Sequence, residues 1–219
     1  MKLLELVLSA LYPPKCILCK DLLEKEQMDL CRSCRTTAAR WKSHRQKIRF
    51  VDDYTAVWYY EDRVRESLLR YKFSNARSYA EGYGRMVAME VSKELPEGID
   101  LVTWVPIGPK RMRERGYDQC QLLAQVVGKE LELPVQKLLR KPRDNKVQSS
   151  LTDAAARRAN VLGVYSLCDA DAAFGKNILL LDDIITTGAT VSEAARVLHD
   201  AGAKHVYCAA VAAGRNQKQ

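Results

Sequence analysis

The stretch 177–190 constrains the fold of this chain more than any other part of the sequence. Four apolar residues are followed by two carboxylates, two more apolar residues and a turn rich in hydroxyl groups and glycine. A short continuous apolar run predicts a buried strand, which we expect to end at Asp182 and Asp183. A helical pattern over 191–201 follows the turn. The segment therefore predicts a strand–turn–helix unit of an α/β fold.

The turn after the two carboxylates contains groups that suit a phosphate. Three threonine hydroxyl groups can donate hydrogen bonds, and Gly188 lets the backbone approach an anion closely. The free amides and the dipole at a helix start attract a dianionic phosphate. The carboxylates can instead accept hydrogen bonds from neutral hydroxyl groups, such as those of a ribose ring. These groups predict a sugar-phosphate site; the alternative is an ordinary unit in which Asp and Thr act as caps.

Strand and helix patterns alternate through the rest of the chain. Strands are expected at 54–60, 101–105, 161–167 and 206–211, and helical patterns cover 64–71, 83–91 and 117–132. Such alternation predicts a parallel sheet covered by helices on both faces. Ligands of such sheets bind beyond the carboxyl ends of the strands.

Two polar loops are candidates for binding further anions. The loop 106–119 contains four basic residues, Lys110, Arg111, Arg113 and Arg115. A pyrophosphate suits a separate cationic loop of this kind, and a solvated helix start is the alternative. The loop 140–151 is a candidate lid over the ligand, or equally a mobile connector.

The net charge of +8 arises from three segments. Sixteen of the 35 Lys and Arg residues lie in 30–51, 107–117 and 137–146, beside only two acidic residues, so the remainder is net acidic. Segregated basic patches indicate phosphates of a nucleotide or a nucleic acid, unless they serve only solubility. The run between Asp29 and Asp52 has seven basic residues and no acid: Arg32, Arg35, Arg40, Lys42, Arg45, Lys47 and Arg49. Nearby aromatic side chains, Trp41, Phe50 and Tyr54, could stack on bases.

Four cysteines form two knuckles, and they are Cys16, Cys19, Cys31 and Cys34. Two CxxC pairs at this spacing predict one tetrahedral zinc site, in a segment too small to fold around its own core. Disulfide bonds are the competing interpretation, which a reducing cytosol disfavours. We expect Cys120, Cys168 and Cys208 to be buried without a role.

The first fourteen residues predict an amphipathic helix rather than a signal peptide, because Glu5 interrupts the apolar run and no small-residue cleavage site follows. No apolar stretch reaches the roughly 18 residues that a membrane span needs. We expect two units. Residues 1–49 would form the helix, the cysteine module and the basic segment, and residues 50–219 the α/β domain.

The segment 178–190 resembles the 5-phosphoribosyl-1-pyrophosphate (PRPP) motif of type I phosphoribosyltransferases, an apolar run followed by two acids, two apolar residues and Thr-Thr-Gly-x-Thr. The resemblance implies that Asp182 and Asp183 bind the ribose 2′- and 3′-hydroxyl groups as the catalytic residues. It implies that the 5′-phosphate is cradled by Thr186, Thr187, Gly188, Ala189 and Thr190. It further implies that pyrophosphate binds the loop containing Lys110 and Arg111, and that Mg²⁺ accompanies PRPP through substrate oxygens.

Over nearly its full length the chain resembles the ComF competence family. Besides the PRPP motif and both CxxC pairs, the matches are Tyr12 to Cys16, Val64-Arg-Glu66, Lys72-Phe73, Val105-Pro106, Arg115 to Gln119, Arg157 and Asn160. Asp118 departs from the asparagine expected there. The resemblance implies a type I phosphoribosyltransferase fold with a small N-terminal zinc module. It also implies a cytoplasmic protein of natural transformation, with single-stranded DNA and competence or recombination proteins as partners.

Three functions follow from these expectations. The first is an enzyme that transfers a phosphoribosyl group from PRPP to an acceptor that the sequence does not identify. The second is a competence accessory that binds single-stranded DNA, and the third is a PRPP-sensing regulator without turnover. A phosphoribosyltransferase core does not by itself establish turnover.

Overall fold

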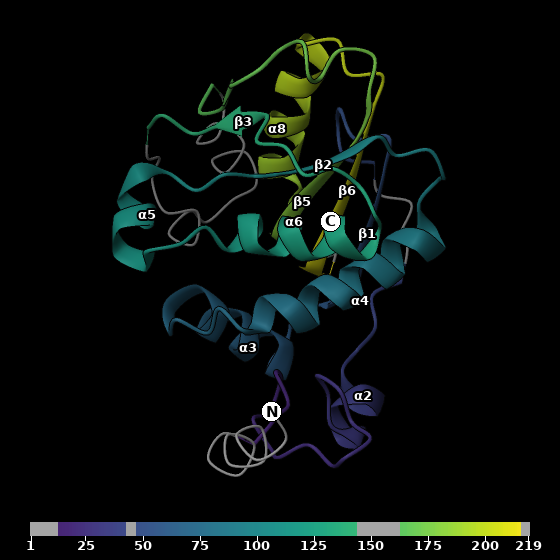
Figure 1. Ribbon diagram of the computed structural model, residues 1–219, viewed down its shortest axis with the longest axis vertical. Coiled ribbons are helices and arrows are strands. Elements are labelled where there is room, and N and C mark those ends of the chain that lie inside the picture. Colours follow the sequence, from purple (N-terminus) through teal and green to yellow (C-terminus); the bar gives the residue numbers. More distant parts are fainter. Residues whose placement is uncertain (1–12, 43–46, 144–162, 216–219) are drawn as a thin grey trace, which may run out of the picture.

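A four-stranded parallel sheet forms the centre of the computed structural model, which describes residues 13–42, 47–143 and 163–215 (Figure 1). The strands lie in the order β1 (Asp53–Tyr59), β6 (His205–Ala213), β5 (Asn177–Ile185) and β2 (Leu101–Trp104). Every neighbouring pair runs parallel. This confirms the parallel sheet predicted from the alternation of strand and helix patterns.

Helices cover both faces of this sheet (Figure 1). The described helices are α2 (Arg32–Thr37), α3 (Asp62–Phe73), α4 (Tyr79–Glu94), α5 (Pro109–Arg115), α6 (Gln119–Glu130) and α8 (Ala189–Asp200). Leu179 and Leu181 of β5 pack in one apolar cluster with α4 and α6, whereas Ile178 and Leu180 pack in another with α8. All four side chains are fully buried. Alternate residues of one strand therefore bury two apolar faces, as the continuous apolar run requires.

Strand β5 extends beyond the point where we expected it to end. The prediction that it stops at Asp182 and Asp183 is wrong, because β6 continues beside it and pairs Asp182 with Ala210 and Ile185 with Ala213. On the other side β2 is short. After the Val105 amide donates to the Leu181 carbonyl at 2.9 Å, the chain turns away at a proline, which has no N–H for the ladder. The two carboxylates thus lie on a strand whose neighbour on one side has already ended.

The cationic loop between β2 and α6 contains a short helix of its own. Helix α5 starts with Pro109 and ends at Gly116, which has a left-handed φ of 73°. Asp118 then caps α6, and its carboxylate accepts hydrogen bonds from the amides of Ile107, Cys120 and Gln121. Asp118 therefore fastens both ends of the α5 segment, and this accounts for an aspartate where the family resemblance suggested asparagine.

The strand expected at 161–167 is shorter and lies outside the main sheet. Strand β4 (Ser166–Leu167) pairs antiparallel with β3 (Leu139–Arg140). The predicted N-terminal helix and most of the candidate lid lie outside the described residues. Among the residues that the structure does describe, no helix combines the length and apolar character needed to cross a membrane.

The cysteine module packs against α3 at one end of the molecule (Figure 1). Ile17 and Leu18, which lie between the first two cysteines, share an apolar cluster with Leu68 of α3 and Tyr83 of α4. The Ser67 hydroxyl and the Arg70 guanidinium of α3 donate hydrogen bonds to the main-chain carbonyl of Ile17. The module is therefore joined to α3 by both apolar and polar contacts.

Candidate functional site

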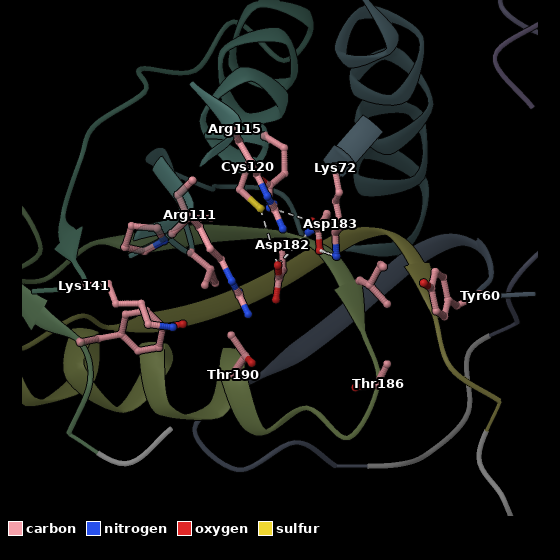
Figure 2. A pocket seen from close by; sticks show the side chains of 16 residues that line it. Tyr60, Lys72, Arg111, Arg115, Cys120, Lys141, Asp182, Asp183, Thr186 and Thr190 are labelled. Carbon is pink, nitrogen blue, oxygen red and sulfur yellow. Dashed lines mark hydrogen bonds and ion pairs between the residues drawn. The ribbon is translucent and has the colours of Figure 1, made fainter. Parts of the chain in front are cut away.

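A cavity of about 320 Å³ opens where β2 ends beside β5 (Figure 2). Its wall includes two carboxylates, Asp182 and Asp183, and two hydroxyl groups, those of Thr186 and Thr190. Four cations also line it: Lys72, Arg111, Arg115 and Lys141. The cavity thus combines acceptors for neutral hydroxyl groups with donors for anions.

The remaining predicted phosphate-site residues form the turn behind the cavity. The amide of Ala189 donates to the Thr187 hydroxyl at 3.4 Å, so this threonine closes the turn itself. Gly188 has a left-handed φ of 73°, and a Cβ at this position would lie 3.0 Å from the side chain of Ile48. Only glycine fits a left-handed turn packed this closely.

The predicted pyrophosphate residues separate in the structure. Arg111 lines the cavity, whereas Lys110 is largely exposed and forms an ion pair with Glu114 at 3.9 Å along α5. Arg115, one turn further along the helix, also lines the cavity, and its guanidinium donates to the Gln119 side-chain oxygen at 2.7 Å. Two of the four basic residues of this loop therefore face the cavity.

The two carboxylates are buried and engaged with protein groups. The Lys72 ammonium lies 3.0 Å from one Asp183 oxygen, and the Gln119 amide donates to the other at 3.0 Å. One Asp182 oxygen accepts from the Asp183 amide at 2.8 Å and from the Cys120 thiol at 3.6 Å. Burial, together with the neighbouring charge of Asp183, raises the pKa of Asp182 to about 8. Near neutral pH the environment therefore favours the protonated form of Asp182.

Sequence reasoning missed several residues of this cavity. Lys72, Gln119 and Cys120 contact the carboxylate pair, and Lys141 approaches from the side of Arg111 (Figure 2). Lys72 and Gln119 belong to short motifs of the family resemblance, which was the only signal for them. Lys141 is 9% exposed, and its ammonium lies 5.4 Å from the centre of the Tyr165 ring.

The expectation for the three remaining cysteines is only partly correct. Cys208 is buried within the sheet, as predicted. Cys168 is exposed, so its predicted burial is wrong, because it follows the short edge strand β4 rather than a core strand. Cys120 is buried, but its thiol faces Asp182, so it is part of the cavity wall.

The four cysteines of the two knuckles converge. The sulfur atoms of Cys16, Cys19, Cys31 and Cys34 all lie within 4.8 Å of one another, and those of Cys19 and Cys31 are 3.6 Å apart. Four sulfurs around a tetrahedral zinc ion, with Zn–S bonds of about 2.3 Å, would lie about 3.8 Å apart. All seven cysteines of the chain have free thiols, so no disulfide competes for these four. The cluster fits a structural zinc ion, which would cross-link the two knuckles.

The basic run is mostly exposed, but its aromatic neighbours are less so. Arg32, Arg35, Lys42, Lys47 and Arg49 are exposed, whereas Arg45 lies outside the described residues. Arg40 forms an ion pair with Glu90. Trp41 is 9% exposed and packs on Tyr54 at 5.3 Å between ring centres, so the expected stacking of Trp41 on bases is not available in this conformation.

Comparison with protein families matches the two parts of the chain separately. A phosphoribosyl transferase domain matches residues 118–219, and a double zinc ribbon domain matches residues 7–45. The first match contains the carboxylates and the phosphate turn, and the second contains all four clustered cysteines. The type I phosphoribosyltransferase fold and the N-terminal zinc ribbon predicted from the sequence are therefore confirmed.

Several curated relatives match most of the chain. Competence protein ComFC of Bacillus subtilis is 28% identical over 79% of this chain and 67% of its own length. Competence protein F of Haemophilus influenzae is 27% identical over 71% of this chain and 70% of its own length. The chain is a homologue of the ComF competence proteins. This ComF homologue is also similar to the DNA utilization protein YhgH of Escherichia coli, at 29% identity over 63% of this chain and 62% of that protein.

Solved structures similar to the ComF homologue include two phosphoribosyl enzymes. The glutamine PRPP amidotransferase of B. subtilis is 21% identical, with a TM-score of 0.44, over 64% of this chain and 30% of that one. The adenine phosphoribosyltransferase of Leishmania tarentolae is 12% identical, with a TM-score of 0.36, over 61% of this chain and 56% of that one.

Proposed function

We propose that the cavity binds PRPP or a related phosphoribosyl ligand. The observation that carries this proposal is that the Asp182–Asp183 pair and the hydroxyl groups of Thr186 and Thr190 line one cavity with four cationic side chains. A ribose phosphate needs both kinds of partner within the length of one small molecule. A bare anion would leave the two carboxylates without the hydroxyl donors that a ribose supplies.

The ligand's groups can be assigned to parts of the cavity by their charge. The ribose hydroxyl groups would lie at the carboxylate pair, and the 5′-phosphate at the turn that starts α8, where free amides and the helix dipole favour an anion. A pyrophosphate would lie toward Arg111, Arg115 and Lys141, which Figure 2 shows on the far side of Asp182 from Thr186. Mg²⁺ would arrive with the ligand and bind chiefly through its phosphate and hydroxyl oxygens.

These groups suit phosphoribosyl transfer. In that reaction the bond between ribose C1 and the pyrophosphate oxygen breaks, and a bond between C1 and the acceptor forms. Cations at Arg111 and Lys141 would stabilise the charge that develops on the leaving pyrophosphate, and the carboxylates would orient the ribose. The same binding without an acceptor would make the protein a PRPP-sensing regulator.

Titration calorimetry with Mg²⁺ tests this proposal directly. We expect PRPP to bind more tightly than ribose 5-phosphate, and inorganic pyrophosphate to compete with PRPP. An Arg111→Met variant should lose the preference for PRPP over ribose 5-phosphate. Lys110→Met is the matched control, because Lys110 lies on the same helix but outside the cavity wall. Absence of any PRPP binding would refute the proposal.

A second function, binding of single-stranded DNA, is supported by two observations. The relatives are named for competence and DNA utilization. Two exposed cations of the basic run, Lys47 and Arg49, also flank the proposed phosphate turn, because Ile48 between them packs against Gly188. A strand following this run would pass the cavity. We therefore propose that the chain handles single-stranded DNA during uptake, in the cytoplasm, where the free cysteine thiols would stay reduced.

A further inference from the structure

Lys72 reaches the carboxylate pair from α3, outside the segment matched by the phosphoribosyl transferase domain. Its ammonium lies 3.0 Å from Asp183, and its side chain is only 19% exposed. Figure 2 shows it approaching the pair from the side opposite Thr186 and Thr190. A lysine with no place in the PRPP motif thus contacts one of the two motif carboxylates.

Burial makes the ionisation of two adjacent carboxyl groups unfavourable, and the ammonium of Lys72 lowers that cost. Asp182 is 8% exposed and Asp183 is 4% exposed, so water does little to stabilise charge on either. Two such groups cannot both ionise without a nearby cation, and burial alone favours the protonated forms. A carboxyl group that keeps its proton has fewer acceptor sites for ribose hydroxyl groups.

Other charged and titratable groups also face the pair. They are Arg111 and Arg115 from α5, Asp118 and Cys120 at the start of α6, Tyr71 from α3, and Tyr165. The Cys120 thiol donates to Asp182, and the burial of this thiol raises its pKa. Arg115 donates to Gln119 rather than to a carboxylate. Lys72, by contrast, makes a direct ion pair with Asp183.

Helix α3 holds Lys72 in place through contacts on both of its sides. Toward the cysteine module, the Arg70 guanidinium donates to the main-chain carbonyls of Ile17 and Leu18. Toward the cavity, the Tyr71 hydroxyl donates to the main-chain carbonyl of Gln119 at 2.7 Å. The last turn of α3 is therefore fastened immediately before Lys72, so the ammonium needs little further ordering to reach Asp183.

We propose that Lys72 is a positioning residue that keeps the Asp182–Asp183 pair singly ionised at neutral pH, and so able to accept hydrogen bonds from ribose hydroxyl groups. The role in ribose binding rests on the proposed function, whereas the effect on the protonation of the pair does not. Burial and Asp183 raise the pKa of Asp182, and Lys72 acts in the opposite direction. Removal of the ammonium should therefore let the pair keep both of its protons to higher pH.

Infrared spectroscopy of the ligand-free protein tests the protonation directly, by following the protonated carboxyl band of the pair against pH. In Lys72→Met the midpoint at which the pair loses the first of its two protons should move upward by about 1–3 pH units, the usual effect of a neighbouring opposite charge. Lys72→Arg should restore the parent midpoint. Lys129→Met, at an exposed lysine of α6, should leave it unchanged. A midpoint in Lys72→Met that is equal to or below the parent's would overturn the proposal.

A second measurement follows PRPP affinity against pH, with zinc content and thermal unfolding as checks on folding. Lys72→Met should bind more weakly at pH 7, by about tenfold for each unit by which the midpoint for loss of the first proton exceeds pH 7, and should recover at higher pH. A merely structural role for Lys72 would weaken binding equally at every pH. If the parent binds no phosphoribosyl ligand but the carboxyl midpoint moves, the proposed function fails and this inference stands. If PRPP binds and neither profile depends on Lys72, this inference fails alone.

Discussion

The guanidinium of Arg70 donates a hydrogen bond to the main-chain carbonyl of Leu18 at 2.5 Å, and this contact joins α3 to the first cysteine knuckle. Leu18 lies between Cys16 and Cys19, and Lys72 follows Arg70 by two residues. One helix therefore contacts both the cysteine cluster and the carboxylates of the cavity. A substitution at either site should therefore affect the stability of α3.

We expect Arg70→Met to destabilise the fold by about 1–3 kcal/mol, because it leaves the partly buried Leu18 carbonyl without its donor. Urea denaturation measures the change. Arg65→Met, at an exposed arginine of the same helix, controls for the loss of charge and should change the stability by less than about 0.5 kcal/mol. Equal stability of the two variants would contradict a bracing role for Arg70.

The cysteine cluster should hold one zinc ion per chain. Elemental analysis of the double variant Cys31→Ala, Cys34→Ala should show loss of the metal, because two thiolates cannot complete a tetrahedral site. Its melting temperature should also fall, since the module relies on the metal for folding. Cys168→Ala is the matched control, as this cysteine is exposed and outside the cluster. Unchanged zinc in the double variant would show that the cluster is not the site.

The carboxylate of Asp183 should contribute to PRPP binding. Asp183→Ala should weaken binding by about 1.5–3 kcal/mol, the usual cost of losing a hydrogen bond to a charged group. Inorganic phosphate should still compete for the turn at 186–190, because that turn is untouched. Calorimetry of the parent and the variant measures both effects. Equal PRPP affinity in the two proteins would remove Asp183 from the site.

Asp182 should make stability depend on pH. Its folded-state pKa of about 8 lies above the unfolded value of about 4, so between these pH values the folded state binds more protons than the unfolded chain. The free energy of unfolding should therefore fall as the pH rises through this window. Asp182→Asn cannot ionise and should flatten that decline, whereas Asp171→Asn, at an exposed position, should not. Denaturation of all three proteins at pH 5 and pH 8 measures the difference; an unflattened decline in Asp182→Asn would argue against the raised pKa.

The basic run should bind single-stranded DNA with strong dependence on salt. If four of its cations contact phosphates, the slope of log affinity against log salt should be about −3, from about 0.7 per contact. Substituting Gln for Arg32, Arg35, Lys42 and Lys47, all exposed, should flatten this slope. Fluorescence anisotropy with a labelled oligonucleotide measures it.

The converse variant, Asp182→Asn with Asp183→Asn, serves as the control for that experiment. It should lose PRPP binding but keep the parent's salt dependence of DNA affinity, because the carboxylates lie in the cavity and not in the basic run. A parent protein without salt-sensitive binding of single-stranded DNA would leave phosphoribosyl transfer or sensing as the better assignment.

The parts of the fold that were predictable are those determined by local pattern. The apolar run of β5, the turn at Gly188 and the two CxxC pairs each need only neighbouring residues to define them, because strand burial, left-handed turns and metal knuckles have short-range signatures. The division into units at 1–49 and 50–219 stays a prediction. The packing of Ile17 and Leu18 in one cluster with α3 and α4 was not visible from the sequence.

The sequence by itself determined which residues form the strand, the phosphate turn and the cysteine knuckles. Only the tertiary structure decided which side chains meet the carboxylates. Lys72 and Asp183 are more than a hundred residues apart, and their contact depends on how α3 packs against the end of β5. Likewise, β5 runs past its carboxylates because β6 continues to pair with it. The cavity opens on the other side, because β2 has already ended there. Strand lengths and charge pairs of this kind depend on neighbours in space, which periodicity along the chain cannot specify.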